Sequence, residues 1–97
     1  MELTGKQKRH LRGLAHHLHP TVYAGKEGVS EAVERKATQE LEAHELIKLK
    51  LGDGCADDKK EAAERVAAYC NAAVVQIIGK TIILYRRRKA DPAIVLP

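Results

Sequence analysis

Apolar residues near the start of the chain recur with the spacing of a helix. Four of them follow the i, i+3, i+4, i+7 pattern, namely Leu11, Leu14, Ala15 and Leu18. Thr4 and Gln7 have the spacing of a capping box, and Pro20 is expected to end the helix. The face opposite the apolar stripe would carry Arg9, Arg12 and His16.

The middle of the chain predicts a strand, a helix and a second strand. Residues 21–24 are β-prone, and Ser30 is the expected N-cap of a helix that ends near residue 43. Apolar and polar residues then alternate over residues 45–51, which is typical of a half-buried strand. Its two faces would carry Ile47, Leu49 and Leu51 on one side and Leu46, Lys48 and Lys50 on the other.

The last part predicts a helix and a β-hairpin. Asp58 with Glu61 would cap the helix, and Asn71 would close it. Two runs rich in Val and Ile, residues 73–78 and 81–86, are separated by Gly79-Lys80, which is typical of a two-residue hairpin turn. The order is an N-terminal helix followed by βαβαββ, an α/β (α+β) fold with a four-stranded mixed sheet.

Length and charge narrow the class of protein. The 97 residues, 44% of them hydrophobic, predict one domain over residues 1–88 with its own core; residues 89–97 would form a loose tail or an edge strand. The net charge is +4 over residues 1–26, −4 over residues 27–79 and +4 over residues 80–97. This distribution favours a one-sided basic surface that faces a polyanion. With no apolar leader or membrane-length run, we expect a cytoplasmic protein with no membrane partner.

The most informative local motif is a glycine loop, Gly25-Lys26-Glu27-Gly28, between the first strand and the second helix. Two glycines allow a tight turn and close approach of a ligand, exposed amides can form an anion nest, and Lys26 adds a charge. Glu27 would oppose an anion unless it points away. The alternative is that the glycines only turn the chain.

Other basic residues extend the candidate interface: Lys6, Lys8, Arg9, Arg12, Lys80, Arg86, Arg87 and Arg88. In a parallel βαβ arrangement the turns after the first and third strands share one sheet edge, which would place Lys26 near Lys80. A first helix packed antiparallel to the first strand would return its basic start to that edge. Residues 86–89 would begin at the opposite edge.

Signals for metal binding and catalysis are weak. Histidines gather at His10, His16, His17 and His19, but neighbouring helical residues point apart and neither cysteine has paired ligand spacing. Contacts with helix-end carbonyls or with RNA phosphate are the alternatives to zinc. Catalytic motifs are missing from the sequence, and a chain without Phe or Trp argues against the aromatic base-stacking sheet of an RNA-recognition motif. We therefore expect no metal, cofactor, small-molecule substrate or enzymatic activity.

Five motifs in order resemble the YhbY family, the bacterial stand-alone form of the CRM domain. They are Leu3-Thr4-Gly5-Lys6-Gln7, Leu11-Arg12-Gly13-Leu14-Ala15-His16, Gly25-Lys26-Glu27-Gly28, His44-Glu45-Leu46-Ile47-Lys48 and Gln76-Ile77-Ile78-Gly79-Lys80-Thr81, within about residues 2–87. The resemblance implies an RNA-binding domain similar to the C-terminal domain of translation initiation factor three, associated with precursors of the large ribosomal subunit. It maps RNA binding onto the glycine loop, the basic first helix and Lys80. The loop is also comparable to the GXXG loop of KH domains.

Charge placement and resemblance together predict a non-catalytic, monomeric RNA-binding protein that acts on ribosomal RNA during assembly of the large subunit. The alternative is a protein-interaction module that docks on a ribosomal or assembly-factor protein through the sheet or residues 90–97. An exposed apolar patch on the sheet would favour that alternative.

Overall fold

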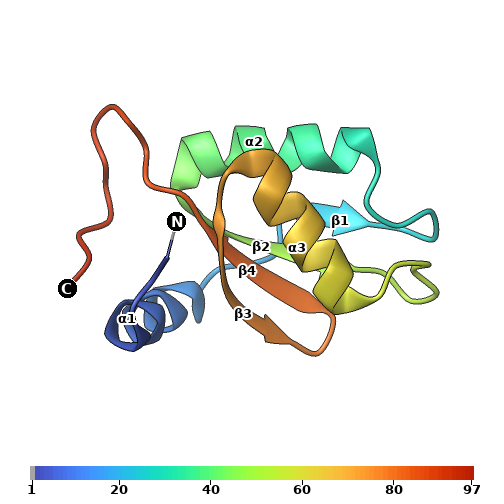
Figure 1. Ribbon diagram of the computed structural model, residues 1–97, viewed down its shortest axis with the longest axis horizontal. Coiled ribbons are helices and arrows are strands. Elements are labelled where there is room, and N and C mark those ends of the chain that lie inside the picture. Colours follow the sequence, from blue (N-terminus) through green and yellow to red (C-terminus); the bar gives the residue numbers. More distant parts are fainter. Residues whose placement is uncertain (1) are drawn as a thin grey trace.

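The computed structural model describes residues 2–97 and has three helices on a four-stranded sheet (Figure 1). In chain order the elements are α1 (Gly5–Ala15), β1 (Val22–Ala24), α2 (Glu31–His44), β2 (Leu46–Leu51), α3 (Lys59–Cys70), β3 (Ala73–Ile78) and β4 (Thr81–Tyr85). The predicted order and the α+β class are confirmed.

Local capping signals place the helix ends. Thr4 Oγ1 accepts the Gln7 amide (3.1 Å) and Gln7 Oε1 accepts the Thr4 amide (3.0 Å), so the predicted capping box is present. The predicted caps of the other helices also form, at Ser30, Asp58 and the left-handed residue Asn71.

The first helix ends earlier than predicted. It stops at Ala15, well before Pro20, and the Leu18 side chain lies outside the helix with 37% of its surface exposed. Only Leu11 and Ala15 of the expected stripe are buried. The amide of Leu18 bonds to the carbonyl of Ala15, and Lys48 Nζ donates to the carbonyl of Leu18 (3.0 Å). The contact between Lys48 of β2 and Leu18 therefore helps to direct the chain from α1 toward β1. The spacing of apolar residues carries no information about this contact.

The sheet is mixed, with strand order β1-β2-β4-β3. β1 is parallel to β2, whereas β4 is antiparallel to both β2 and β3. The predicted hairpin is therefore confirmed, and β1, β2 and β3 run in one direction. Their last residues lie at one end of the sheet, the "loop end", which holds the turns at residues 25–28, 52–57 and 79–80.

Helices cover both faces of the sheet, but not equally. α2 and α3 pack on one face over a large apolar cluster. α1 packs on the other face through Leu11 and Ala15, which meet Leu46, Val75, Ile83 and Tyr85. The prediction that Leu46 lies on a polar, exposed face is wrong: it is 4% exposed because α1 covers the start of β2. Farther along β2, Lys50 on the same face is exposed as predicted.

Residues 89–97, predicted to be a loose tail or an edge strand, form no strand and contact the rest of the protein as part of a C-terminal segment, residues 86–97. The segment has no regular secondary structure and runs from β4 back past α1 (Figure 1). The carboxylate of Glu45, at the end of α2, is fully buried and accepts the amides of Arg88 (2.8 Å), Ala93 (2.6 Å) and Ile94 (2.9 Å). Glu45 was predicted to begin a strand, but it caps α2 with a positive φ of 65°. Ile94 and Leu96 then pack against the cluster under α1.

Candidate nucleic-acid interface

The glycine loop is a tight turn at the loop end of the sheet. The amide of Gly28 donates to the carbonyl of Gly25 (3.0 Å), which leaves Lys26 and Glu27 exposed at the tip. Gly28 has a φ of +79°, which L side chains rarely adopt. The turn therefore projects one positive and one negative side chain into solvent.

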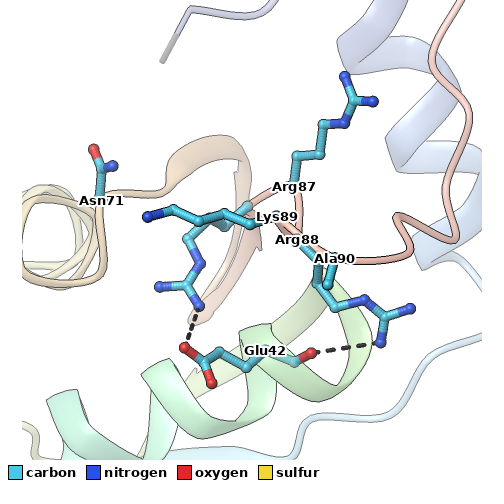
Figure 2. Close-up of a pocket in the computed structure, with 7 residues that line it drawn as sticks. Glu42, Asn71, Arg87, Arg88, Lys89 and Ala90 are labelled. Atoms are coloured by element: carbon cyan, nitrogen blue, oxygen red, sulfur yellow. Dashed lines mark hydrogen bonds and ion pairs between the residues drawn. The ribbon is translucent and has the colours of Figure 1, made fainter.

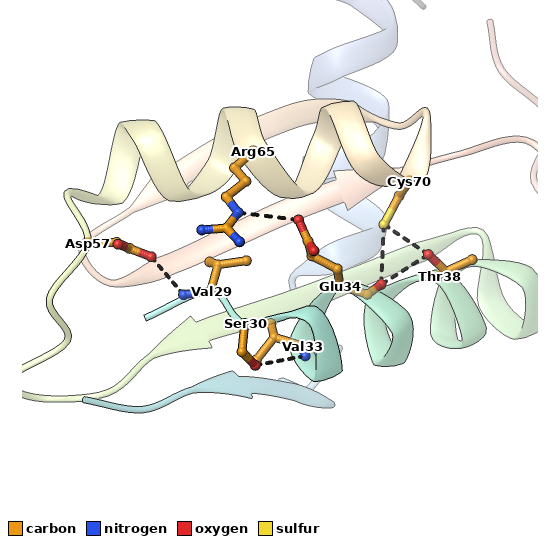
Figure 3. A network of polar contacts seen from close by, with 8 residues as sticks. All are labelled: Val29, Ser30, Val33, Glu34, Thr38, Asp57, Arg65 and Cys70. Carbon is orange, nitrogen blue, oxygen red and sulfur yellow. Dashed lines mark hydrogen bonds and ion pairs between the residues drawn. The ribbon is translucent and has the colours of Figure 1, made fainter. Parts of the chain in front are cut away.

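A second loop, at residues 52–57, supports this turn from within the protein. Ala56 donates its amide to the carbonyl of Lys26 (3.1 Å). The carboxylate of Asp57 accepts the amide of Val29 (2.6 Å), and Figure 3 shows this contact directly after the glycine loop. A Cβ on Gly28 would collide with the Asp57 carboxylate. A glycine is therefore needed at position 28 to make room for the carboxylate of Asp57, whether or not a ligand binds nearby.

These contacts use amides that were expected to be free to bind an anion. The amides of Gly28 and Val29 are already bonded, to a carbonyl and to the Asp57 carboxylate respectively. A negative charge from the protein thus occupies the position where a nest would hold a phosphate. The loop can still present Lys26 to a phosphate as a point charge on a rigid turn. The expectation of a nest that includes Gly28 is wrong, because residues 28 positions apart complete the turn.

Lys80 joins the loop end, as the topology predicts. Its carbonyl accepts the amide of Leu51 (2.8 Å), so the hairpin turn lies beside the end of β2. Its ammonium donates to Asp53 Oδ1 (2.5 Å); that hydrogen bond and the lysine charge hold the pKa of the Asp53 carboxyl below its ordinary value, and Lys50 adds to the effect. Lys80 and Lys50 therefore share one acid, and the group retains a positive charge.

The basic residues of α1 do not reach the loop end. Lys6, Lys8, Arg9 and Arg12 are exposed, but Lys8 lies beside Ala72, Ala73 and Val74, where β3 begins. The helix crosses the far end of the sheet, opposite the glycine loop (Figure 1). The expectation that α1 packs along β1 and returns its basic start to the loop end is wrong. The apolar stripe shows which face of α1 is buried, but it does not show which strands the helix covers.

Two of the three C-terminal arginines have partners within the protein. Arg86 donates to the carbonyl of Cys70 (3.1 Å) and pairs with Glu42 (3.2 Å), and Arg88 donates to the carbonyl of Ala43 (3.1 Å). These guanidinium groups satisfy the last carbonyls of α3 and α2, where positive charge is favourable. Figure 2 shows the Arg87 side chain pointing away from these contacts, and it is exposed. Of the three, Arg87 is the arginine best placed to meet RNA.

The remaining polar groups do not assemble a cluster of metal ligands within residues 2–97. Groups of three or more potential metal ligands are not found there. The expectation that the side chains of His16 and His17 point apart is wrong: their rings meet edge to face with centroids 5.5 Å apart, because α1 ends at Ala15 and both residues follow it. Burial raises the pKa of the Cys70 thiol, which lies 3.3 Å from Thr38 Oγ1 between α2 and α3 (Figure 3). A thiol in that position is a poor nucleophile. None of the helices of residues 2–97 is long and apolar enough to cross a membrane.

Two residues at the loop end were missed from the sequence. Asp57 has no local signal in the sequence, because its neighbour Asp58 accounts for the helix cap and its own partner, Val29, is distant in the chain. Tyr23 lies on the sheet face opposite Val22 and Ala24 with 63% of its surface exposed. The sequence offers one signal for this: side chains alternate between the two faces of a strand, so in residues 22–24 Tyr23 must face away from its two apolar neighbours.

Comparisons with known proteins agree on one family. The profile of the CRS1 / YhbY (CRM) domain matches residues 3–86. The "Probable RNA-binding protein YqeI" of Bacillus subtilis is 44% identical over 95 residues, which cover 98% of this chain and 99% of the relative. The "RNA-binding protein" of Haemophilus influenzae is 40% identical over 84 residues, 87% of this chain and 85% of that protein. The solution structure of SAV1595 from Staphylococcus aureus matches with a TM-score of 0.84 at 43% identity, covering 99% of this chain and 100% of that one.

Proposed function

This chain belongs to the CRS1/YhbY (CRM) domain family, and from that premise we propose that it is a non-catalytic RNA-binding protein. The relatives named above carry RNA binding in their names, and the match extends over nearly the whole chain. The resemblance expected from the five sequence motifs is thereby confirmed.

The observation that carries the proposal is the rigid presentation of Lys26. The turn is fixed by the Gly28–Gly25 and Ala56–Lys26 backbone bonds, so its backbone has little further freedom to lose when Lys26 meets a phosphate. Lys50 and Lys80 lie at the same end of the sheet, held by the register of β2 and β4. Phosphate contacts of this kind give affinity without reading sequence.

We propose further that the RNA is ribosomal RNA in precursors of the large subunit, which would place the protein in the cytoplasm. The resemblance to the YhbY family supports this choice. In-cell crosslinking followed by RNA sequencing tests it: enrichment of precursor large-subunit RNA is expected. Crosslinks confined to messenger or transfer RNA would contradict it.

The test of RNA binding itself is a salt titration with purified protein and a structured ribosomal RNA fragment. If about 4–6 phosphates are contacted, log K should fall with log salt at a slope of roughly −3 to −5. Replacing Lys26 with Ala should weaken binding to every RNA and reduce the slope by about one unit. Lys36→Ala is the matched control, because Lys36 is an exposed lysine on α2 paired only with Glu40.

The outcome separates RNA binding from the protein-docking alternative. Binding that is absent even at low salt, or that does not respond to salt, contradicts an RNA partner and favours docking on a protein. Equal loss in the Lys26 and Lys36 variants would mean that general charge, and not the glycine loop, determines affinity.

A further inference from the structure

Part of one sheet face is left uncovered by the helices. α1 covers the far end of this face, where Leu46, Ile83 and Tyr85 are buried beneath it. Toward the loop end the pairing register continues in one row across all four strands: Tyr23 opposite Lys50, Lys50 opposite Thr81, and Thr81 opposite Ile78. We call these four residues the sheet row. Paired residues on neighbouring strands project from the same face.

The orientation of the sheet row follows from its neighbours. Val22, Leu49, Leu51 and Ile82 belong to the cluster beneath α2 and α3. Residues adjacent along a strand point to opposite faces, so the sheet row points away from those helices. The side chains of Tyr23 and Ile78 are 63% and 55% exposed.

The row combines an aromatic ring with positive charge. The hydroxyl of Tyr23 donates to the carbonyl of Pro20 (3.3 Å), which restrains the ring at the sheet surface. Lys50 is the strand neighbour of Tyr23, and Lys26 and Lys80 project from the adjoining turns. The acids at this end are Glu27 on the turn tip, Asp53, which pairs with Lys80, and Asp57, which accepts the amide of Val29. Two of these three acids are therefore engaged within the protein, and Lys26 and Lys50 have no ion-pair partner among residues 2–97.

We propose that the sheet row binds an unpaired RNA nucleotide, with the base stacked on Tyr23 and the adjoining phosphate held by Lys50. The inference rests on the proposed RNA binding and adds the kind of RNA structure recognised. An aromatic face accepts any base, so the contact selects single-stranded over paired nucleotides without selecting a sequence. One tyrosine provides one stacking position, in contrast to sheets that stack two or three bases on several aromatics.

Charge complementarity favours RNA over a protein partner for this face. A protein-docking patch would be expected to have an apolar centre depleted of lysine. Here the polar residues Lys50 and Thr81 stand between the exposed Tyr23 and Ile78, at the centre of the row. A phosphate chain that crosses the row would meet the lysine beside the ring.

The test compares a fluorescein-labelled single-stranded RNA of mixed sequence with a blunt-ended duplex of the same strand. Tyr23→Ala should weaken binding to the single strand by about 5- to 150-fold and leave duplex binding nearly unchanged. Tyr23→Phe keeps the ring and loses only the exposed hydrogen bond to Pro20, so it should retain most of the affinity for the single strand. Tyr69→Ala is the matched control, since Tyr69 is 50% exposed on α3, which covers the opposite sheet face.

Salt dependence separates stacking from charge. Tyr23→Ala removes no charge, so its salt slope should equal that of the original protein, whereas Lys50→Ala should reduce the slope by about one unit. The chain contains no Trp. Tyr23→Trp therefore introduces a single indole whose fluorescence should be quenched by the single-stranded RNA and not by the duplex.

Each outcome decides the inference. Equal affinity of Tyr23→Ala and the original protein for single-stranded RNA would overturn it, as would equal losses on both RNAs or an indole that RNA does not quench. If the original protein binds neither RNA, the proposed function itself fails. The melting temperature of each variant is measured as a control for folding. If Tyr23→Ala lowers the melting temperature, the inference is judged from the Tyr23→Phe and Tyr23→Trp variants.

Discussion

At the residue scale, Glu45 is an acidic residue held by amides from a distant part of the chain. It is fully buried, and three amides of the C-terminal segment point at its carboxylate. Burial alone would raise the pKa of this carboxyl. The amides of Arg88, Ile94 and Ala93, with the Arg88 charge, outweigh burial and hold the pKa below its ordinary value. The charged form is therefore the one that stabilises the fold.

We predict that Glu45→Gln changes how stability depends on pH. Because the pKa of Glu45 is lower in the folded protein, the charged carboxylate contributes its full stabilisation at pH values above the pKa of the unfolded chain, about 4.3. This contribution is lost as the pH falls through the lower pKa of the folded protein. The variant should lose about 1–3 kcal/mol of unfolding free energy near pH 7, and the difference should shrink below about pH 4. Urea unfolding from pH 3 to 7 measures both curves. Parallel curves would contradict a stabilising charge at this residue.

At the scale of elements, the C-terminal segment fastens the ends of α2 and α3 and adds to the apolar cluster under α1. Arg86 and Arg88 donate to the last carbonyls of α3 and α2, and Ile94 with Leu96 reaches the cluster beside Leu11. Gln7 of α1 also donates to the carbonyl of Pro97 (3.3 Å). The segment thus connects three helices although it forms no element itself.

Adjacent residues of this segment provide a matched pair of variants. Ile94 packs against the cluster, whereas Val95 is 82% exposed. Ile94→Ala should lower the unfolding free energy by about 1–2 kcal/mol, and Val95→Ala should change it by less than about 0.5 kcal/mol. Thermal or urea unfolding measures the difference. Equal effects from the two variants would show that the segment is not docked in solution.

At the scale of the whole molecule, two groups of exposed cations lie far apart from each other. One group lies on α1, which has four Lys and Arg and no acid in its sequence. The other lies at the loop end and comprises Lys26, Lys50 and Lys80. The molecule is 37 Å along its longest axis, and the two groups lie toward opposite ends of the sheet (Figure 1). A structured RNA that engaged both groups would have to extend along the protein.

We predict that the two groups act independently on a long RNA. Arg9→Ala and Lys26→Ala should each weaken binding to a structured ribosomal RNA fragment, and the double variant should show the sum of the two free-energy changes, because distant charges couple weakly. On an oligonucleotide too short to span the protein, the losses should not add. Fluorescence anisotropy at fixed salt measures all four proteins. An Arg9 variant that binds the long RNA normally would remove α1 from the interface.

Much of the secondary structure could be predicted from sequence because its signals are local. The Thr4–Gln7 capping box, the Asp58 cap and the Gly79-Lys80 hairpin each depend on residues within a few positions of one another. The sequence also predicted that the turns after β1 and β3 lie at the same end of the sheet, because the two strands run in the same direction. The glycine loop, too, was recognised from its residues alone.

Tertiary structure decided the features whose partners are far apart in the chain. Leu46 is buried because α1 crosses the start of β2, and Asp57 completes a turn 28 residues earlier. Glu45 meets an amide 49 residues away, and the sheet row exists only once four strands are in register. The sequence by itself determined the order and most of the extent of the helices, strands and turns, since short-range sterics and hydrogen bonds govern them, whereas the end of α1 and the role of Glu45 depended on distant contacts. Packing determined which charges stay free, because a side chain's partners depend on which surfaces the folded chain brings together.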